Sequence, residues 1–332
     1  MNSTTVSSAL ANPLASFNNL HKNGDRECLQ GPSHYDALSE SHLQGIAQYE
    51  DLYLITQNRS GHDSGKLYVF RVSPPQQCIF TTHLDVSPSS AALGGNGQAF
   101  NHPGGVQLAG KYLFVPVQTE DYNNTRIQVY DVQALTSDNP SIALVNNSLI
   151  PDCDDRKIES IGVAFDEANG NYVIVGLQGS DLYFYRTAGS DLSVPVSGGY
   201  AFTCKVPEHN DAGPQTINLL YGGDGQLYLV NFAVREKAVV LFTDYAYLYQ
   251  VTWSEGLGDP ASARHFITHG SSTPGVNQPH FRWGSGIHID ETGINLLVTQ
   301  RVMQEKCYIN RFEQKTDGSD ADGEPEGIEA IG

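Results

Sequence analysis

Basic residues are scarce in this chain of 332 residues. Lysine and arginine together number 19 against 37 aspartates and glutamates, which gives a formal net charge of −18 at pH 7. Proteins that bind a phosphate backbone need clustered Lys and Arg, and anionic membrane surfaces attract such clusters too. We therefore expect neither nucleic acid nor a membrane as a partner. A small-molecule substrate or ligand fits better, bound by a monomer or a weak homo-oligomer.

Long apolar runs are missing as well. No stretch approaches the roughly 20 apolar residues that a membrane-spanning helix needs. Residues 1–8 have neither the basic start nor the apolar run of a signal peptide. We expect a cytoplasmic protein, or a secreted one if a leader has been removed.

Cysteine is present, but not in a pattern that builds a framework. The five cysteines are odd in number and include no CxxC pair, so we expect no disulfide scaffold. Cys78, Cys204 and Cys307 lie in expected strands, where a free thiol behaves as a small apolar group.

What the chain does contain is an internal repeat. Each copy predicts two short strands around a tight polar turn, then a third strand rich in aromatic and β-branched residues. The copies begin at residues 45, 105, 162, 216 and 286, and their third strands are expected at 66–71, 126–131, 181–186, 245–250 and 307–312. A fourth strand is expected at 78–83, 142–145, 200–204 and 265–268. Five copies of four antiparallel strands predict an all-β fold, a five-bladed β-propeller with four-stranded antiparallel blades.

The fifth copy has no fourth strand of its own. Propellers remove such an open edge by taking a strand from the other terminus, and the candidates here are residues 14–20 and 27–30. We predict a last blade closed by an N-terminal strand, and one domain, because all copies must close a single ring. The expected parts are an arm with the closing strand at 1–35, the propeller at 36–314 and an acidic disordered tail at 315–332.

Two segments are longer than the repeat requires. Residues 84–101 form a long loop, which inside a compact domain is usually functional or mobile. Residues 233–244 are an insertion in the fourth copy, and we expect their apolar half to pack on a neighbour or to cover a cleft.

Candidate site residues follow from the position three residues before each copy begins. The innermost strands of a propeller surround the axis, so these side chains should converge at the mouth of the central channel. They are His42, His102, Glu159, Gly213 and Trp283, and His280 and His288 flank the last of them. The candidate catalytic residues are His42, His102, Glu159, His280 and His288.

Three hypotheses compete for the histidines. In the first, His42, His102 and His280 hold one divalent metal ion together with Glu159, and zinc, iron or calcium is the expected cofactor. In the second there is no cofactor, and one histidine with a pKa near neutral pH works with Glu159 in acid–base catalysis. In the third, the imidazoles only bond carbonyl groups of adjacent blades.

A second ring of side chains lies at the ends of the second strands. It consists of Gln57, Gln118, Gln178 and Gln300. Because the ring recurs in nearly every blade, we favour a structural role that joins blade to blade, with substrate contact as the alternative. The candidate walls and anchors of the site are Arg59, Phe100, Phe281, Trp283 and Arg301.

The predicted architecture resembles the five-bladed glycosidases of the arabinanase and invertase type. That resemblance implies carboxylates from separate blades around the axial pocket. Glu159 stands at a suitable place, but blades one and two carry His42 and His102 at the equivalent positions, so the carboxylate set is not reproduced. Lectin propellers are similar in fold too, but their sites repeat blade by blade, whereas these copies have diverged and indicate one axial site.

The favoured function is a small-molecule-transforming enzyme of lyase, isomerase or hydrolase type with one site at the axial mouth, metal-assisted in the first of the three hypotheses. The alternative is a non-catalytic propeller that binds a ligand or a protein, as a lectin or an interaction scaffold does. Buried, converging titratable groups at the mouth would favour the enzyme.

Overall fold

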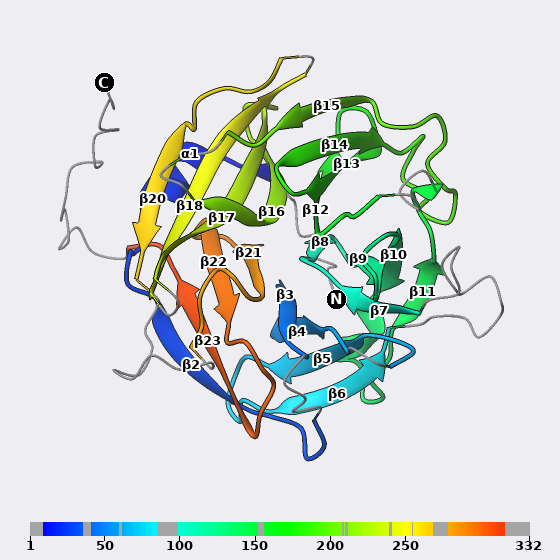
Figure 1. The fold of residues 1–332 in the computed structure, drawn as a ribbon, viewed down its shortest axis with the longest axis vertical. Coiled ribbons are helices and arrows are strands. Elements are labelled where there is room, and N and C mark those ends of the chain that lie inside the picture. Colours follow the sequence, from blue (N-terminus) through cyan, green and yellow to red (C-terminus); the bar gives the residue numbers. More distant parts are fainter. Residues whose placement is uncertain are drawn as a thin grey trace.

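Antiparallel sheets form five blades around a central axis (Figure 1). The computed structural model describes residues 9–35, 41–59, 62–84, 99–151, 156–207, 209, 212–238, 241–253, 255–267 and 278–315. Within this part of the chain no helix is long and apolar enough to cross a membrane. The predicted all-β, five-bladed architecture is confirmed.

Blades 1 to 3 follow the repeat in chain order. Blade 1 contains β3 (Leu43–Tyr49), β4 (Leu52–Gln57), β5 (Lys66–Arg71) and β6 (Cys78–His83). Blade 2 has its inner strand in two pieces, β7 (Phe100–Pro103) and β8 (Gln107–Ala109), followed by β9 (Tyr112–Thr119), β10 (Thr125–Asp131), the short 3-10 helix η2 (Gln133–Thr136) and β11 (Ala143–Asn146). Blade 3 contains β12 (Ser160–Asp166), β13 (Asn171–Gln178), β14 (Asp181–Arg186) and β15 (Phe202–Lys205).

Blades 4 and 5 depart from this pattern. Blade 4 contains β16 (Gly213–Gly222), β17 (Leu227–Ala238), β18 (Leu241–Thr252), β19 (Gly256–Leu257) and β20 (Ser262–Phe266). Blade 5 contains β21 (Ser285–Ile289), β22 (Ile294–Thr299) and β23 (Lys306–Phe312), and its outer strand is β2 (Asp25–Gln30). The insertion at 233–244 lengthens β17 and β18 into one long hairpin, paired as far as Ala238 and Leu241. The side chains of its predicted apolar half, from residue 236 to residue 242, lie outside the described part of the structure.

The N-terminal segment closes the ring. β2 pairs antiparallel with β23, with Asp25 opposite Arg311 and Gln30 opposite Lys306, so the predicted closing strand at 27–30 is confirmed. The other candidate, 14–20, is wrong as a strand. Those residues contribute to helix α1 (Pro13–Asn18), because Asn12 caps its first turn by accepting from the Ala15 N–H (2.9 Å) and proline suits the first helical position.

Two further features belong to the arm and the tail. The short strand β1 (Ala9–Leu10) pairs in parallel with β16, so the arm also reaches the inner strand of blade 4. The predicted disordered tail lies almost wholly outside the described residues, which end at Lys315, and so does most of the long loop predicted at 84–101.

One apolar cluster fills each gap between neighbouring blades. Blades 1 and 2, for example, share a cluster that includes Leu67 and Val115, both fully buried. The cluster between blades 5 and 1 includes Leu29 from the closing strand and Ile55 from β4. The stability of the ring thus depends on burial between blades rather than within any one of them.

The glycines that begin most copies are explained by the convergence of the inner strands. A Cβ atom at Gly286 would lie 2.0 Å from the Ile46 carbonyl oxygen, and one at Gly45 would lie 2.8 Å from the Val106 nitrogen. Real Cβ atoms do not approach backbone so closely, so these positions need glycine. The repeated glycines therefore mark the positions where the inner strands pack too closely at the axis to leave room for a Cβ atom.

A buried glutamine joins three blades near the axis. Gln107 of blade 2 accepts hydrogen bonds through Oε1 from the Val163 N–H of blade 3 and the Leu219 N–H of blade 4, both at 2.8 Å. Its Nε2 donates to the Leu219 carbonyl at 2.6 Å. The side chain thereby satisfies backbone groups that the inner strands leave unpaired.

Candidate active site at the axial mouth

Side chains from blades 1, 2 and 5 converge at one end of the axis. This end, called the axial mouth below, is where the inner strands begin and the second strands end; the tight turns such as Glu50–Asp51 lie at the other end, the turn face. The ring centroids of His42 and His102 are 5.7 Å apart, and those of His42 and Trp283 are 5.8 Å apart. The structure thus brings together these three residues from distant parts of the chain.

Aromatic rings extend this group on both sides. His280 lies 5.3 Å from Trp283, and Tyr122 lies 4.7 Å from His102, both edge to face. Tyr122 is 45 % exposed and has a positive φ of 59°, a conformation that costs a non-glycine residue energy. The mouth therefore presents an exposed ring held in a strained conformation beside a histidine.

Two amides determine how the central histidines are protonated. The backbone N–H of His42 donates to Asn58 Oδ1, so the Nδ2 group of Asn58 must be the part that faces His102 Nδ1, at 3.3 Å. An amide nitrogen donates, so His102 Nδ1 accepts and its ring proton is on Nε2. The Nε2 atom of Gln44 lies 3.0 Å from His102 Nε2 and also contacts His42 Nε2. Two donors would then face each other at His102 Nε2, so we assign the Gln44 amide with its oxygen and nitrogen exchanged, and the oxygen accepts from both rings.

This arrangement holds His102 in its neutral form. Burial and, to a smaller extent, the nearby charge of His42 lower the pKa of His102 to about 3. A protonated ring would lose the hydrogen bond from Asn58. Near neutral pH His102 is therefore a hydrogen-bonded neutral imidazole rather than an acid–base group.

His280 is held by the long hairpin of blade 4. Asp244 on β18 is buried; its Oδ1 accepts from the Phe281 N–H at 3.1 Å and lies 3.9 Å from His280 Nδ1. Burial lowers the pKa of His280 to about 4, and the charge of Arg282 acts in the same direction. The hairpin thus positions His280 against Trp283.

Glu159 is the predicted site residue contributed by blade 3. It precedes β12, and its Oε2 accepts from the Gly179 N–H at 3.4 Å. Glu159 as a whole residue is exposed, but its carboxyl group is partly buried, and this burial raises its pKa above the usual value. The hydrogen bond from the Gly179 N–H and the charge of Lys157 lower the pKa but do not outweigh burial. A carboxyl group with a raised pKa is a candidate proton donor.

The predicted metal site is not assembled. Among the described residues, no three His, Cys, Asp or Glu side chains lie close enough together to hold a metal ion. His42 and His102 turn their Nε2 atoms toward Gln44, where a shared metal would have to sit. The set His42, His102, His280 and Glu159 therefore does not fit a metal in this structure.

The glutamine ring bonds within its own blades. Gln57 Oε1 accepts from the Tyr68 hydroxyl at 2.7 Å inside blade 1. Gln300 accepts from the Tyr308 N–H at 2.9 Å and donates to the Lys306 carbonyl at 3.2 Å inside blade 5. Gln118 is buried, and Gln178 is half-buried with an Oε1 atom that has no hydrogen-bond partner. These contacts of Gln57 and Gln300 support a structural role, and each of them lies within one blade.

Three other predicted site residues lie away from the mouth. Phe281 is fully buried in the core between blades 4 and 5, and Phe100 is 1 % exposed in the cluster between blades 1 and 2, so neither is a wall of the site. His288 lies in β21 three residues after Ser285, roughly 10 Å further along the strand, and its pKa is lowered to about 4 by burial and by Arg311. His288 therefore lies toward the turn face, because β21 runs away from the mouth and His288 is close to the end of that strand.

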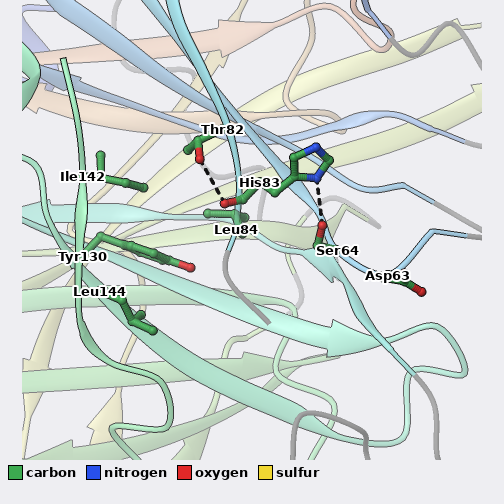
Figure 2. A pocket seen from close by; sticks show the side chains of 8 residues that line it. All are labelled: Asp63, Ser64, Thr82, His83, Leu84, Tyr130, Ile142 and Leu144. Carbon is green, nitrogen blue, oxygen red and sulfur yellow. Dashed lines mark hydrogen bonds between the residues drawn. The ribbon is translucent and has the colours of Figure 1, made fainter. Parts of the chain in front are cut away.

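Arg59 contacts His83, and His83 lines a different feature, a cavity of about 360 Å³ at the gap between blades 1 and 2 (Figure 2). The cavity is lined by Asp63, Ser64, Thr82, His83, Leu84, Tyr130, Ile142 and Leu144. Arg59 Nη1 donates to His83 Nδ1 at 3.1 Å, and Ser64 Oγ lies 2.9 Å from the same atom. His83 Nδ1 is therefore already an acceptor for a guanidinium group, and it is a poor base for activating Ser64.

Sequence reasoning missed Gln44, Asn58, Tyr122 and Asp244. Gln44 is two residues after His42 and Asn58 directly follows Gln57, so proximity in the sequence was an available signal. The sequence holds no signal that places Tyr122 or Asp244 at the mouth. The position of Tyr122 depends on the shape of the β9–β10 turn, and that of Asp244 depends on the length of the β17–β18 hairpin.

Comparisons with known proteins bear on the fold. No family model matches the chain, and no curated protein matches it. Among solved structures, a glycosyl hydrolase from Bacteroides ovatus is 9 % identical, with a TM-score of 0.51 over 82 % of this chain and 84 % of that one. A structure from the GH130 family of mannoside phosphorylases, described as containing glycoside hydrolases that target β-1,2-mannosidic linkages in Candida mannan, is 10 % identical with the same score and coverage.

A tail fibre of Staphylococcus aureus phage P68 also matches, at 11 % identity and a TM-score of 0.45. This chain spans 53 % of the length of the tail-fibre chain. At such identities the likeness to the two glycoside hydrolase structures establishes the propeller fold that they share with this protein. The resemblance in architecture to propeller glycosidases, expected from the repeat, is thereby confirmed.

Proposed function

We propose that this protein is a hydrolase that cleaves a glycoside at the axial mouth. The observation that carries the proposal is the convergence of His42, His102 and Trp283 from three blades at one end of the axis. Neutral hydrogen-bonding rings and an aromatic face suit a sugar, which offers hydroxyl groups at its edge and C–H groups on its faces. The two neighbours described as glycoside hydrolases support the choice of a hydrolase over a lyase or an isomerase.

Glu159 is our candidate for the proton donor. Its raised pKa keeps a larger share of the carboxyl group protonated than an ordinary glutamate has. The acid would protonate the leaving oxygen as its bond to the anomeric carbon breaks. Water adds to that carbon, and its proton restores the acid, so the products are a hemiacetal, which is a new reducing end, and an alcohol.

The test is the release of reducing ends from a panel of oligosaccharides by the full chain and by Glu159→Gln. We expect the variant to lose about 100-fold or more in kcat with a nearly unchanged KM, the range for removal of a general acid. The control is Glu167→Gln, an exposed glutamate in the β12–β13 turn of the same blade, which should behave as wild type. Equal loss in both variants, or full activity in Glu159→Gln, would remove Glu159 from this role.

A non-catalytic glycan-binding protein is the second candidate. It is favoured by the state of the central pair, since His102 is locked by Asn58 and Gln44 in a neutral, fully bonded form. A pair in this state transfers no protons, which suits binding without catalysis. Saturable binding of an oligosaccharide with no product after prolonged incubation would select this candidate.

A further inference from the structure

We propose that the axial mouth selects an anionic sugar, and that Arg301 binds the carboxylate of a uronic acid residue there. The inference rests on the proposed function, because it names the class of substrate for the same site. It starts from the guanidinium group of Arg301, whose central carbon lies 4.9 Å from the centre of the Trp283 ring.

The geometry leaves Arg301 able to bind an anion. A guanidinium group that stacks on an aromatic ring uses its flat face and keeps its edge N–H groups available, and that edge matches the two oxygens of a carboxylate. The Nε atom of Arg301 is buried and has no hydrogen-bond partner among the described residues. A buried donor without an acceptor is costly, and a carboxylate that receives it removes the cost on binding.

The surroundings of Arg301 add positive charge. The guanidinium carbon of Arg282 lies 5.4 Å from the centre of the same tryptophan ring. The field of Arg282 contributes to the lowered pKa of His280, which shows its charge acting at the mouth.

The described carboxyl groups of the mouth make contacts of their own. Asp244 Oδ1 accepts from the Phe281 N–H and lies 3.9 Å from His280 Nδ1. Glu159 Oε2 accepts from the Gly179 N–H, and burial raises the pKa of this carboxyl group. Two guanidinium groups beside one tryptophan are a local exception on a chain with a net charge of −18, and a local positive potential favours an anionic ligand.

Position explains why Arg301 can reach a ligand in the site. Its own carbonyl accepts from the Leu43 N–H at 2.7 Å, so its backbone is tied to the first residue of β3, next to His42. The carboxylate on Arg301 and the sugar hydroxyls near His42 would then belong to one residue of the substrate. Neutral sugars leave the buried Nε without an acceptor, which is the basis of the selectivity.

The experiment is calorimetric titration of the full chain with matched ligands. The probes are oligomers of galacturonate, glucuronate and mannuronate, each compared with its uncharged methyl ester. We expect at least one acid to bind about tenfold or more tightly than its ester, as for a charge-assisted hydrogen bond. Added salt should lower the affinity for the acid and leave the affinity for the ester unchanged.

The variants separate Arg301 from a general effect. Arg301→Gln should bring acid and ester to equal affinity, and Arg301→Lys should keep only part of the preference, because it retains the charge without the fork. The matched control is Arg186→Gln. It also removes a guanidinium group over a tryptophan, 4.1 Å from the Trp253 ring, but in β14 of blade 3, and the preference should persist.

Three results would overturn the inference: no acid binds more tightly than its ester, Arg301→Gln keeps the preference, or Arg186→Gln loses it equally. These outcomes are distinct from failure of the proposed function. Hydrolysis of neutral glycosides with no preference for acids would refute the selectivity for anionic sugars and leave the proposed hydrolase standing. Acid-selective binding without cleavage of any oligosaccharide would sink the hydrolase alone.

Discussion

Acidification should destabilise this protein well above the pH at which its carboxylates titrate. The pKa values of His102, His280 and His288 are lowered to about 3, about 4 and about 4, in each case chiefly by burial. In the unfolded chain each has the ordinary value of 6.5. As the pH falls below 6.5 the unfolded state takes up protons that the folded state does not, so the stability from these groups is complete above pH 6.5 and is lost as the pH falls toward 4 to 3.

The magnitude follows from proton linkage. A difference of one bound proton changes the free energy of unfolding by about 1.4 kcal/mol per pH unit. Between pH 7 and pH 5 each histidine therefore contributes a loss of about 2 kcal/mol, and all three about 6 kcal/mol as an upper bound. Burial raises the pKa of Glu27 and Glu159, and these groups oppose the loss, because the folded state binds their protons more tightly.

The assay is urea-induced unfolding at pH 7 and pH 5, in wild type and in His102→Asn. The variant will be less stable at both pH values, but its loss between them should be about 2 kcal/mol smaller than that of wild type. His34→Asn, at an exposed position, is the control and should show the wild-type difference. If His102→Asn loses as much between pH 7 and pH 5 as wild type does, His102 is not the buried neutral group described above.

Two further predictions concern the ring itself. Replacing Gln107 with Leu should lower the free energy of unfolding by about 3 kcal/mol, because backbone groups of Val163 and Leu219 lose their partners; chemical denaturation measures this, and the exposed Gln133→Leu should change it little. Equal stability of the two variants would mean that water replaces Gln107. Replacing Leu29 with Ala should cost about 2 to 5 kcal/mol, because this fully buried side chain fills the gap between blades 5 and 1. Its control is the exposed neighbour Cys28→Ala, and a cost below about 1 kcal/mol for Leu29→Ala would show that the closing strand contributes little.

The sequence carried the blade architecture because the relevant signals are local. Alternation of apolar and polar residues predicts a strand independently of the rest of the chain. Glycines indicate the tight turns, as at Asp166–Gly170, where Gly170 has a φ of 65°. The predicted strand at 78–83 agrees with β6, and the predicted closing segment at 27–30 lies within β2. The missing strand of the last copy was itself the evidence for closure.

Errors occurred where a segment's structure depends on its neighbours. Residues 14–20 are apolar enough for a strand, and the cap at Asn12 makes them a helix instead. Residues 233–244 have no tight turn signal at the expected end of β17, so the two strands continue past the blade as a hairpin.

Only the tertiary structure decided which polar side chains share the axial mouth. The equivalent positions in the repeat did place His42, His102 and Trp283 together, because strands that begin at one end of an axis bring their first residues into contact. Sequence spacing could not show that His288 lies toward the turn face or that Arg59 turns to His83. Side-chain direction and hydrogen-bond partners depend on contacts between blades, and the chemistry of His102 depends on Asn58 and Gln44, which reach it only when blades 1 and 2 pack side by side.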